Sequence, residues 1–233
     1  MNTEQRQYLQ NCSEWYRQEL TGNIMPFWLK YGLDRENGGV YTCVDRDGTL
    51  IDTTKSVWFQ GRFGFVAAYA YNNIEKNPEW LSASRSCIDF IEAHCIDKDG
   101  QLFFSVTAEG KPLRKRRYVF SDCFAAIAMA EYSKASGDSA FADKALALFK
   151  NIRRMLSTPG ALEPKRFEAG RGHSITMILV NVALVLKQVC NDPSLDEQIA
   201  SSASDIEKYF MHPEFKCILE SVTPEGGLID TCE

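Results

Sequence analysis

A short turn that ends in glycine recurs four times along this chain, each time after a helical stretch. The copies contain Gly48, Gly100, Gly160 and Gly226, at intervals of about 50 to 70 residues. Two amphipathic helical segments lie between successive copies. Because two helices and a turn cannot bury their apolar faces alone, each unit has to stack on further units of its own kind. The recurrence therefore predicts an array or ring of helix pairs.

The spacing of apolar residues predicts seven helices, separated by short strands near 40–44 and 103–107. The second, fourth and sixth helices are the most apolar, whereas the others carry a polar face. This alternation predicts an inner and an outer ring, which is typical of an all-α, α/α-toroid fold built as one domain over residues 1–233. The predicted helices cover 3–22, 55–73, 78–91, 119–136, 138–156, 173–189 and 195–210.

Composition narrows the classes of partner. The net charge of -5 disfavours nucleic acid and anionic membranes as partners. No apolar run is long enough to cross a membrane, and the polar opening Met1–Arg6 is unlike a secretory signal. The 8 cysteines form no Cys-x-x-Cys pair, and none of the 3 histidines pairs with one at zinc-ligand spacing. We therefore expect free thiols in the cytoplasm and no bound metal.

The segment Asp52–Arg62 contains Lys-x-x-Trp-x-Gln-Gly-Arg and resembles the signature of the N-acylglucosamine 2-epimerase family. Gly38-Gly39-Val40-Tyr41, residues 115–126 and residues 176–181 also resemble elements of that family. The resemblance implies an (α/α)6-barrel with a sugar pocket at one end. It further implies interconversion of N-acetylglucosamine and N-acetylmannosamine, without a metal or redox cofactor. Mannose, glucose and the reducing end of cellobiose remain alternative substrates.

The implied reaction removes the proton at C2 of the opened sugar and returns one on the opposite face, through an enediolate. Two acid/base groups with pKa values near neutrality are needed, which favours histidine. In the family the two catalytic histidines lie further along, the first in an Asn-Pro-Gly-His element. The sequence ends at Glu233 before any such element, and six units would need roughly 360 residues. We therefore expect a C-terminally truncated, incomplete ring that is inactive alone.

Arg62 is the predicted catalytic residue, because it matches the family's arginine and its fork of donors suits an enediolate oxygen. We expect its guanidinium to point inward among aromatic walls. Trp58 lies four residues earlier on the same helical face, either as a wall for the sugar ring or as a core tryptophan. Tyr118 begins the next inner helix and either lines the pocket or fills the core.

Three further substrate-binding candidates lie on the sixth helix. His173 and Met177 share a face at i and i+4, and Asn181 continues the same stripe. Helix capping or a buried hydrogen bond is an equal alternative for Asn181. Lys55 is expected near the pocket mouth, with an ordinary solvated lysine as its alternative. The basic run Arg114–Arg117 is interpreted as a solvated loop rather than an anion site.

Three further sequence features are interpreted as structural and not as binding sites. His94 is expected to be a surface or capping histidine near a helix end, and the acidic turns at Asp45 and Asp97 lack the further ligands of a calcium loop. No phosphate-binding Gly-rich loop is present, so no nucleotide is expected as a cofactor.

Two rival functions remain open. One is a non-catalytic interaction module of stacked helix pairs. The other is a glycosidase on the same fold, with Glu168 and Glu220 as its carboxylates. Since an incomplete ring exposes apolar faces, we also expect a homodimer or pairing with a complementary C-terminal chain.

Overall fold

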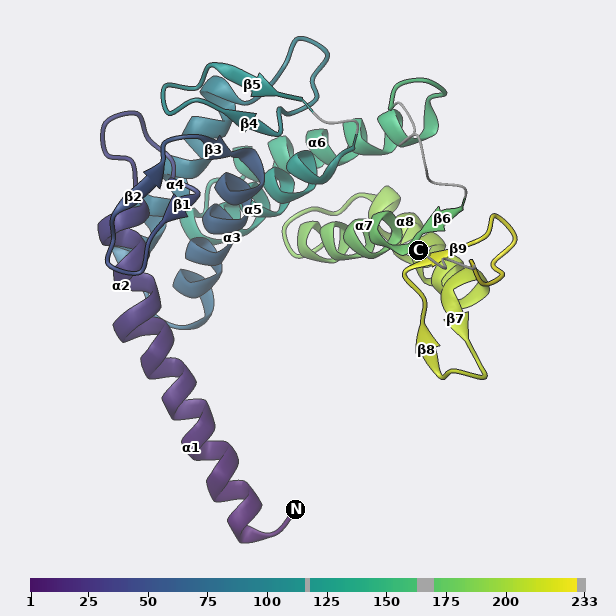
Figure 1. Ribbon diagram of the computed structural model, residues 1–233, viewed down its shortest axis with the longest axis horizontal. Coiled ribbons are helices and arrows are strands. Elements are labelled where there is room, and N and C mark those ends of the chain that lie inside the picture. Colours follow the sequence, from purple (N-terminus) through teal and green to yellow (C-terminus); the bar gives the residue numbers. More distant parts are fainter. Residues whose placement is uncertain (116–117, 163–169, 230–233) are drawn as a thin grey trace.

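The computed structural model describes residues 1–115, 118–162 and 170–229. Figure 1 shows helices arranged in a curved, open array. One layer consists of α3 (Val57–Asn73), α5 (Phe120–Ser136) and α7 (His173–Leu186), with α5 packed between the other two. The second layer consists of α4 (Pro78–His94), α6 (Ala140–Ser157) and α8 (Pro193–Asp205), each packed on the helix before it. The predicted inner and outer layers of an incomplete toroid are confirmed.

The N-terminal helical segment is longer than predicted. It comprises α1 (Thr3–Glu19), the π-helical turn η1 (Leu20–Ile24), α2 (Met25–Phe27) and the π-helical turn η2 (Trp28–Gly32). The prediction that the helix ends at Gly22 is wrong. Met25 and Leu29 are buried in a small core with Trp80, and this burial outweighs the penalty of about 1 kcal/mol for a helical glycine. By contrast, α1 has no buried residue and projects away from the body of the chain (Figure 1).

The strands are short and all pair antiparallel. They form one three-stranded and three two-stranded sheets within the described residues. The first pair is β1 (Cys43–Val44) with β2 (Leu50–Asp52), and the three-stranded sheet has β4 (Ser105–Val106) between β3 (Lys55–Ser56) and β5 (Pro112–Arg114). The last two pairs are β6 (Arg171–Gly172) with β9 (Ser221–Val222) and β7 (Met211–His212) with β8 (Cys217–Ile218). The π-helical turn η3 (Ile206–Phe210) continues α8 and leads into β7.

The recurring glycines adopt the left-handed conformation that their turns require. Gly48, Gly100, Gly160 and Gly226 have φ between +77° and +94°. In the turn 97–101, the Asp97 amide donates to the Gln101 carbonyl and the Gly100 amide donates to the Asp97 carbonyl. The same pair of bonds closes the turns at Gly48 and Gly226. The interpretation of these acidic segments as turns is confirmed.

The first of the four predicted glycine turns is not the one that follows the first helix. The turn at Gly48 does not follow a helix; Gly38, with φ +82°, lies just after the N-terminal helical segment instead. Isolated bridges place Leu33 beside Val40 and Ile96 beside Leu102, so Gly38 is the counterpart of Gly100. Gly48 corresponds to Gly110, which forms a second turn in the next unit. Sequence alone could not separate the two because both turns use the same glycine conformation.

Candidate functional site

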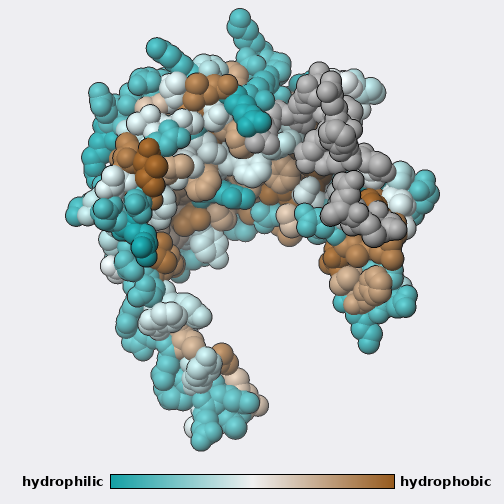
Figure 2. Space-filling view, viewed as in Figure 1, coloured by the Kyte–Doolittle hydropathy of each residue, from teal (hydrophilic) through white to brown (hydrophobic). Residues whose placement is uncertain are grey.

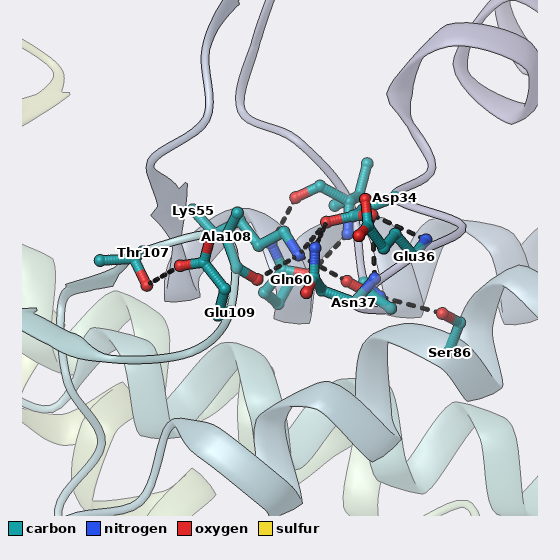
Figure 3. A network of polar contacts seen from close by, with 12 residues as sticks. Asp34, Glu36, Asn37, Lys55, Gln60, Ser86, Thr107, Ala108 and Glu109 are labelled. Atoms are coloured by element: carbon teal, nitrogen blue, oxygen red, sulfur yellow. Dashed lines mark hydrogen bonds and ion pairs between the residues drawn. The ribbon is translucent and has the colours of Figure 1, made fainter.

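The segment that leads into α3 is anchored by a buried lysine (Figure 3). Lys55 Nζ donates to Asp34 Oδ2 at 2.7 Å, to the Gly38 carbonyl at 2.7 Å and to the Ala108 carbonyl at 2.9 Å. Its side chain is 0% exposed and also lies over the Phe90 ring, 4.1 Å from the centroid. The alternative of an ordinary solvated lysine is therefore wrong. All three ammonium donors are used, which makes the burial of this charge tolerable.

The partner carboxylate is equally well satisfied. Asp34 also accepts hydrogen bonds from the Glu36 and Asn37 amides and from the Asn37 side chain. Burial alone would raise the pKa of Asp34, but the hydrogen bonds from Lys55 and Asn37 outweigh it and leave this pKa well below its usual range. Burial, together with the nearby Asp34, raises the pKa of Tyr41 to about 12. Asp34 thus stays ionised, and its pair with Lys55 joins three segments at one point.

Two further residues of the motif attach α3 to its surroundings. Gln60 Oε1 accepts from the Val40 amide at 2.8 Å, and Gln60 Nε2 donates to the Val40 carbonyl at 2.6 Å. Gly61 faces α5, where an added Cβ would lie 2.5 Å from the carbonyl carbon of Phe124 and 2.8 Å from the Ala125 nitrogen. The helices can approach this closely only because position 61 has no side chain.

Trp58 is the centre of an aromatic cluster. Four rings surround it, with centroid distances of 5.4 to 6.0 Å; they belong to Phe104, Tyr118, Phe120 and Phe124. The Phe104 and Tyr118 rings meet the indole edge-on, a favourable arrangement for aromatic pairs. The indole Nε1 is buried, and no hydrogen-bond acceptor lies within reach among the described residues. The structure thus brings Tyr118 and Trp58 together, as the pocket prediction requires.

Arg62 lies on the exposed edge of this cluster. Its guanidinium carbon is 4.3 Å from the Phe124 ring centroid and 5.5 Å from that of Trp58. The side chain is exposed, so the expectation that its guanidinium points inward is wrong, although the group still lies against two aromatic rings. Phe59 and Val66 on the same face of α3 are exposed as well. Arg62 also borders an apolar groove of about 240 Å³, lined mainly by residues of α3 and of the helical segment 20–28.

The three candidates on α7 form a separate group. The His173 ring packs edge-on against Phe210, with centroids 5.3 Å apart, and its amide donates to the Glu220 carbonyl. Met177 and Asn181 are exposed on α7. Among the contacts of the described residues, none joins these side chains to Trp58 or Arg62. Their substrate-binding roles stay predictions.

The basic segment before α5 is partly engaged in ion pairs. Lys115 contacts Asp97 at 2.6 Å and Asp99 at 2.5 Å, so it braces the turn 97–101. The hydrogen bonds from Lys115 lower the pKa of both aspartates. Arg116 and Arg117 lie outside the described residues, as does Glu168. Glu220, the other glycosidase candidate, is exposed and has its carbonyl bonded to the α7 backbone.

Two general features complete the picture of the described part of the chain. It holds no cluster of histidine, cysteine and acidic side chains that could bind a metal ion. Within the same residues, no helix is both long enough and apolar enough to cross a bilayer.

Sequence reasoning missed four residues near the cluster: Phe104, Phe120, Phe124 and the buried Asp122. A signal for two of them was present. Phe120 and Phe124 are spaced i and i+4 at the start of α5, as Trp58 and Arg62 are at the start of α3. An alignment of α3 with α5 would have matched Phe120 to Trp58 and Phe124 to Arg62.

Comparison with known proteins assigns the family. The sequence profile of the N-acylglucosamine 2-epimerase (GlcNAc 2-epimerase) family matches residues 39–222. This chain belongs to that family. A bovine (Bos taurus) N-acylglucosamine 2-epimerase is 27% identical over 224 residues, covering 90% of this chain and 52% of the relative. A cellobiose 2-epimerase from Ruminococcus albus is 33% identical over 141 residues, which are 59% of this chain and 36% of the relative.

Solved structures agree on the fold. The structure of cellobiose 2-epimerase from Bacillus thermoamylovorans B4167 matches with a TM-score of 0.85 at 21% identity, over 94% of this chain and 61% of that one. A sugar epimerase from a ruminal bacterium matches with a TM-score of 0.80 at 23% identity, over 91% and 59%. The chain spans about half the length of the curated relatives it matches.

Proposed function

We propose that this chain forms the Arg62-bearing part of a sugar 2-epimerase site that interconverts N-acetylglucosamine and N-acetylmannosamine. One observation carries the proposal: the guanidinium of Arg62 lies against the Trp58 and Phe124 rings on an exposed face of α3. A cation at the edge of an aromatic wall suits a sugar, whose C–H face packs on rings while its oxygens accept hydrogen bonds. Membership of the family supports this reading.

In the proposed reaction, Arg62 holds the carbonyl oxygen of the opened sugar and stabilises the negative charge of the enediolate. Trp58 supports the sugar ring. Proton removal and return at C2 need two further groups with pKa values near neutrality. The histidines of this chain are engaged elsewhere: His173 packs on Phe210, His94 on Phe90 and His212 on Phe215. We therefore propose that other segments of a complete site supply the acid/base groups.

An NMR assay for N-acetylmannosamine formed from N-acetylglucosamine tests this division of roles. We expect no turnover by the purified chain, and robust turnover would refute the assignment of the proton-transfer groups to other segments. Cellobiose should be assayed in parallel, because the cellobiose 2-epimerase of Ruminococcus albus is 33% identical over its matched segment. Turnover of cellobiose would favour that second substrate.

Binding tests the role of Arg62 itself. We expect weak, saturable sugar-induced NMR shifts that are lost in Arg62→Met while the urea midpoint stays the same. Arg46→Met, in an exposed turn, is the matched control and should bind as the wild type does. Normal sugar binding by Arg62→Met would refute the role of Arg62, and no sugar binding by the wild type would favour the interaction-module alternative.

We also propose that the exposed apolar faces are covered by a second copy or by a complementary helical chain. Tyr8, Trp15 and Tyr16 on α1 are 68%, 56% and 63% exposed, and Phe59 lines the groove beside Arg62. Figure 2 shows a few brown, apolar side chains among the mainly hydrophilic ones of the projecting helix α1. Sedimentation of the purified chain distinguishes a dimer from a monomer that needs a partner.

The free thiols of the described cysteines support a reducing compartment such as the cytoplasm.

A further inference from the structure

The bridged loops 33–40 and 96–102, called hairpins here, are attached to the inner helices α3 and α5 in the same way. The hairpin amide of Val40 donates to Gln60, near the start of α3, at 2.8 Å. The hairpin amide of Leu102 donates to Asp122 Oδ1, near the start of α5, at 3.2 Å. In both cases the side chain lies 20 residues after the amide it binds. Because Val40 and Leu102 also occupy equivalent bridges, Asp122 is the structural counterpart of Gln60.

Each of these attachments, called a clamp from here on, is a hydrogen bond between a hairpin amide and a helix side chain, and the two clamps differ in the donors available. Gln60 both accepts from and donates to Val40, whereas an ionised carboxylate can only accept. Asp122 is 0% exposed, and its Oδ2 is buried with no hydrogen-bond partner among the described residues. A buried, ionised carboxylate with a bare oxygen is costly, and a proton on Oδ2 removes the charge that dominates this cost.

The charged groups around Asp122 do not neutralise it. Burial raises the pKa of Asp122 to about 7, and the negative charge of Asp99 adds to this effect. Lys115 acts in the opposite direction, but it is already paired with Asp97 and Asp99. The adjacent Cys123 is buried, and its thiol pKa is raised by burial, so it brings no charge to the site.

We propose that Asp122 is a positioning residue that works as a neutral carboxylic acid: Oδ1 accepts from the Leu102 amide, and a proton on Oδ2 keeps a charge out of this buried site. It holds the 96–102 hairpin on α5 and so fixes the start of the helix that carries Phe120 and Phe124. Those two rings pack on Trp58, with centroids 5.4 and 5.7 Å away. Ionisation of Asp122 places an unneutralised charge in this buried site and so destabilises the packing around it. The relevance of this positioning to sugar binding rests on the proposed function, but the clamp itself does not.

The test compares urea unfolding of the wild type with Asp122→Asn across pH, since asparagine keeps the shape and carries a permanent donor. Relative to Asp122→Asn, the folding equilibrium constant of the wild type should fall about tenfold per pH unit between about pH 4.5 and 6.5, because the unfolded state alone is ionised there. The difference should level off above about pH 7. Parallel profiles for the two proteins would overturn the proposal.

The mirror variant Gln60→Glu provides a second check, and it should acquire a similar decline with rising pH. If Asp122→Asn fails to fold, a carbon-13 NMR titration of wild-type aspartates decides: one carboxyl should titrate near neutral pH, and none doing so would refute the neutral acid.

Fluorine NMR of protein labelled with 5-fluorotryptophan reads the positioning directly. The Trp58 resonance, assigned with Trp58→Phe, should shift over the same pH range in the wild type and stay fixed in Asp122→Asn. Trp80, buried on α4, is the internal control. A Trp58 resonance whose chemical shift stays constant over this pH range would overturn the positioning role. None of these measurements uses sugar, so failure of the proposed function leaves them unaffected.

Discussion

Replacing Lys55 by methionine should destabilise this chain more than any exposed lysine substitution. The variant leaves Asp34 ionised and buried, and it frees the Gly38 and Ala108 carbonyls from their shared donor. Removing one partner of a buried pair costs about 3–5 kcal/mol, a large part of the roughly 5–15 kcal/mol that stabilises a typical domain. Since methionine fills most of the lysine volume, cavity formation contributes little.

Urea unfolding followed by circular dichroism measures this cost, with Lys98→Met as the matched control at an exposed site. The double variant Lys55→Met/Asp34→Asn should be less destabilised than the sum of the two single variants, because the uncompensated charge has gone. A loss below about 1 kcal/mol for Lys55→Met, or strict additivity in the double variant, would refute the reasoning.

The same pair sets an acid limit to stability. The pKa of Asp34 is lower in the folded chain than in the unfolded chain, so its contribution is present above about pH 4 and is lost as the pH falls further. In Lys55→Met the largest favourable hydrogen bond to Asp34 is missing. Urea unfolding should therefore show that the stability difference between the wild type and Lys55→Met shrinks as the pH falls below about 4.

Two smaller predictions concern packing and thiol chemistry. Gly61→Ala should cost about 1–3 kcal/mol in urea unfolding because its Cβ meets the Phe124 backbone, whereas Gly64→Ala, with neighbours no closer than 3.4 Å, should be neutral or slightly stabilising; equal effects would contradict the tight approach at position 61. Burial raises the pKa of the Cys123 thiol, so a maleimide should label the exposed Cys217 first, and Cys123 should react only as the chain unfolds.

The helices and their two layers were predictable because each helix carries its own periodic signal. The boundaries predicted for α3 and α5 lie within two residues of the observed ones. The N-terminal helix was misjudged at Gly22 because its continuation depends on Met25 and Leu29 reaching a core with Trp80, a contact far away in sequence. Local propensity cannot report such burial.

The site was only partly predictable, for a related reason. The motif Lys-x-x-Trp-x-Gln-Gly-Arg predicts that Trp58 and Arg62 share a helical face, since they stand at i and i+4, and the two side chains are in contact. The role of Lys55 depends on the loops that contain Asp34 and Ala108, one before and one well after it. No pattern within the motif carries that information.

The geometry divides the residues of this motif into two groups that differ in burial. Lys55, Gln60 and Gly61 are buried and bind loops or approach α5, whereas Trp58 is half-buried among aromatic rings and Arg62 is exposed at the edge of that cluster. A substitution at any of the first three would reduce sugar binding by disturbing the fold, and such a loss would say nothing about chemistry. Arg62 is different, because its side chain can be removed without opening a cavity or leaving a buried charge unpaired. A loss of sugar binding at unchanged stability in Arg62→Met would therefore report on recognition itself.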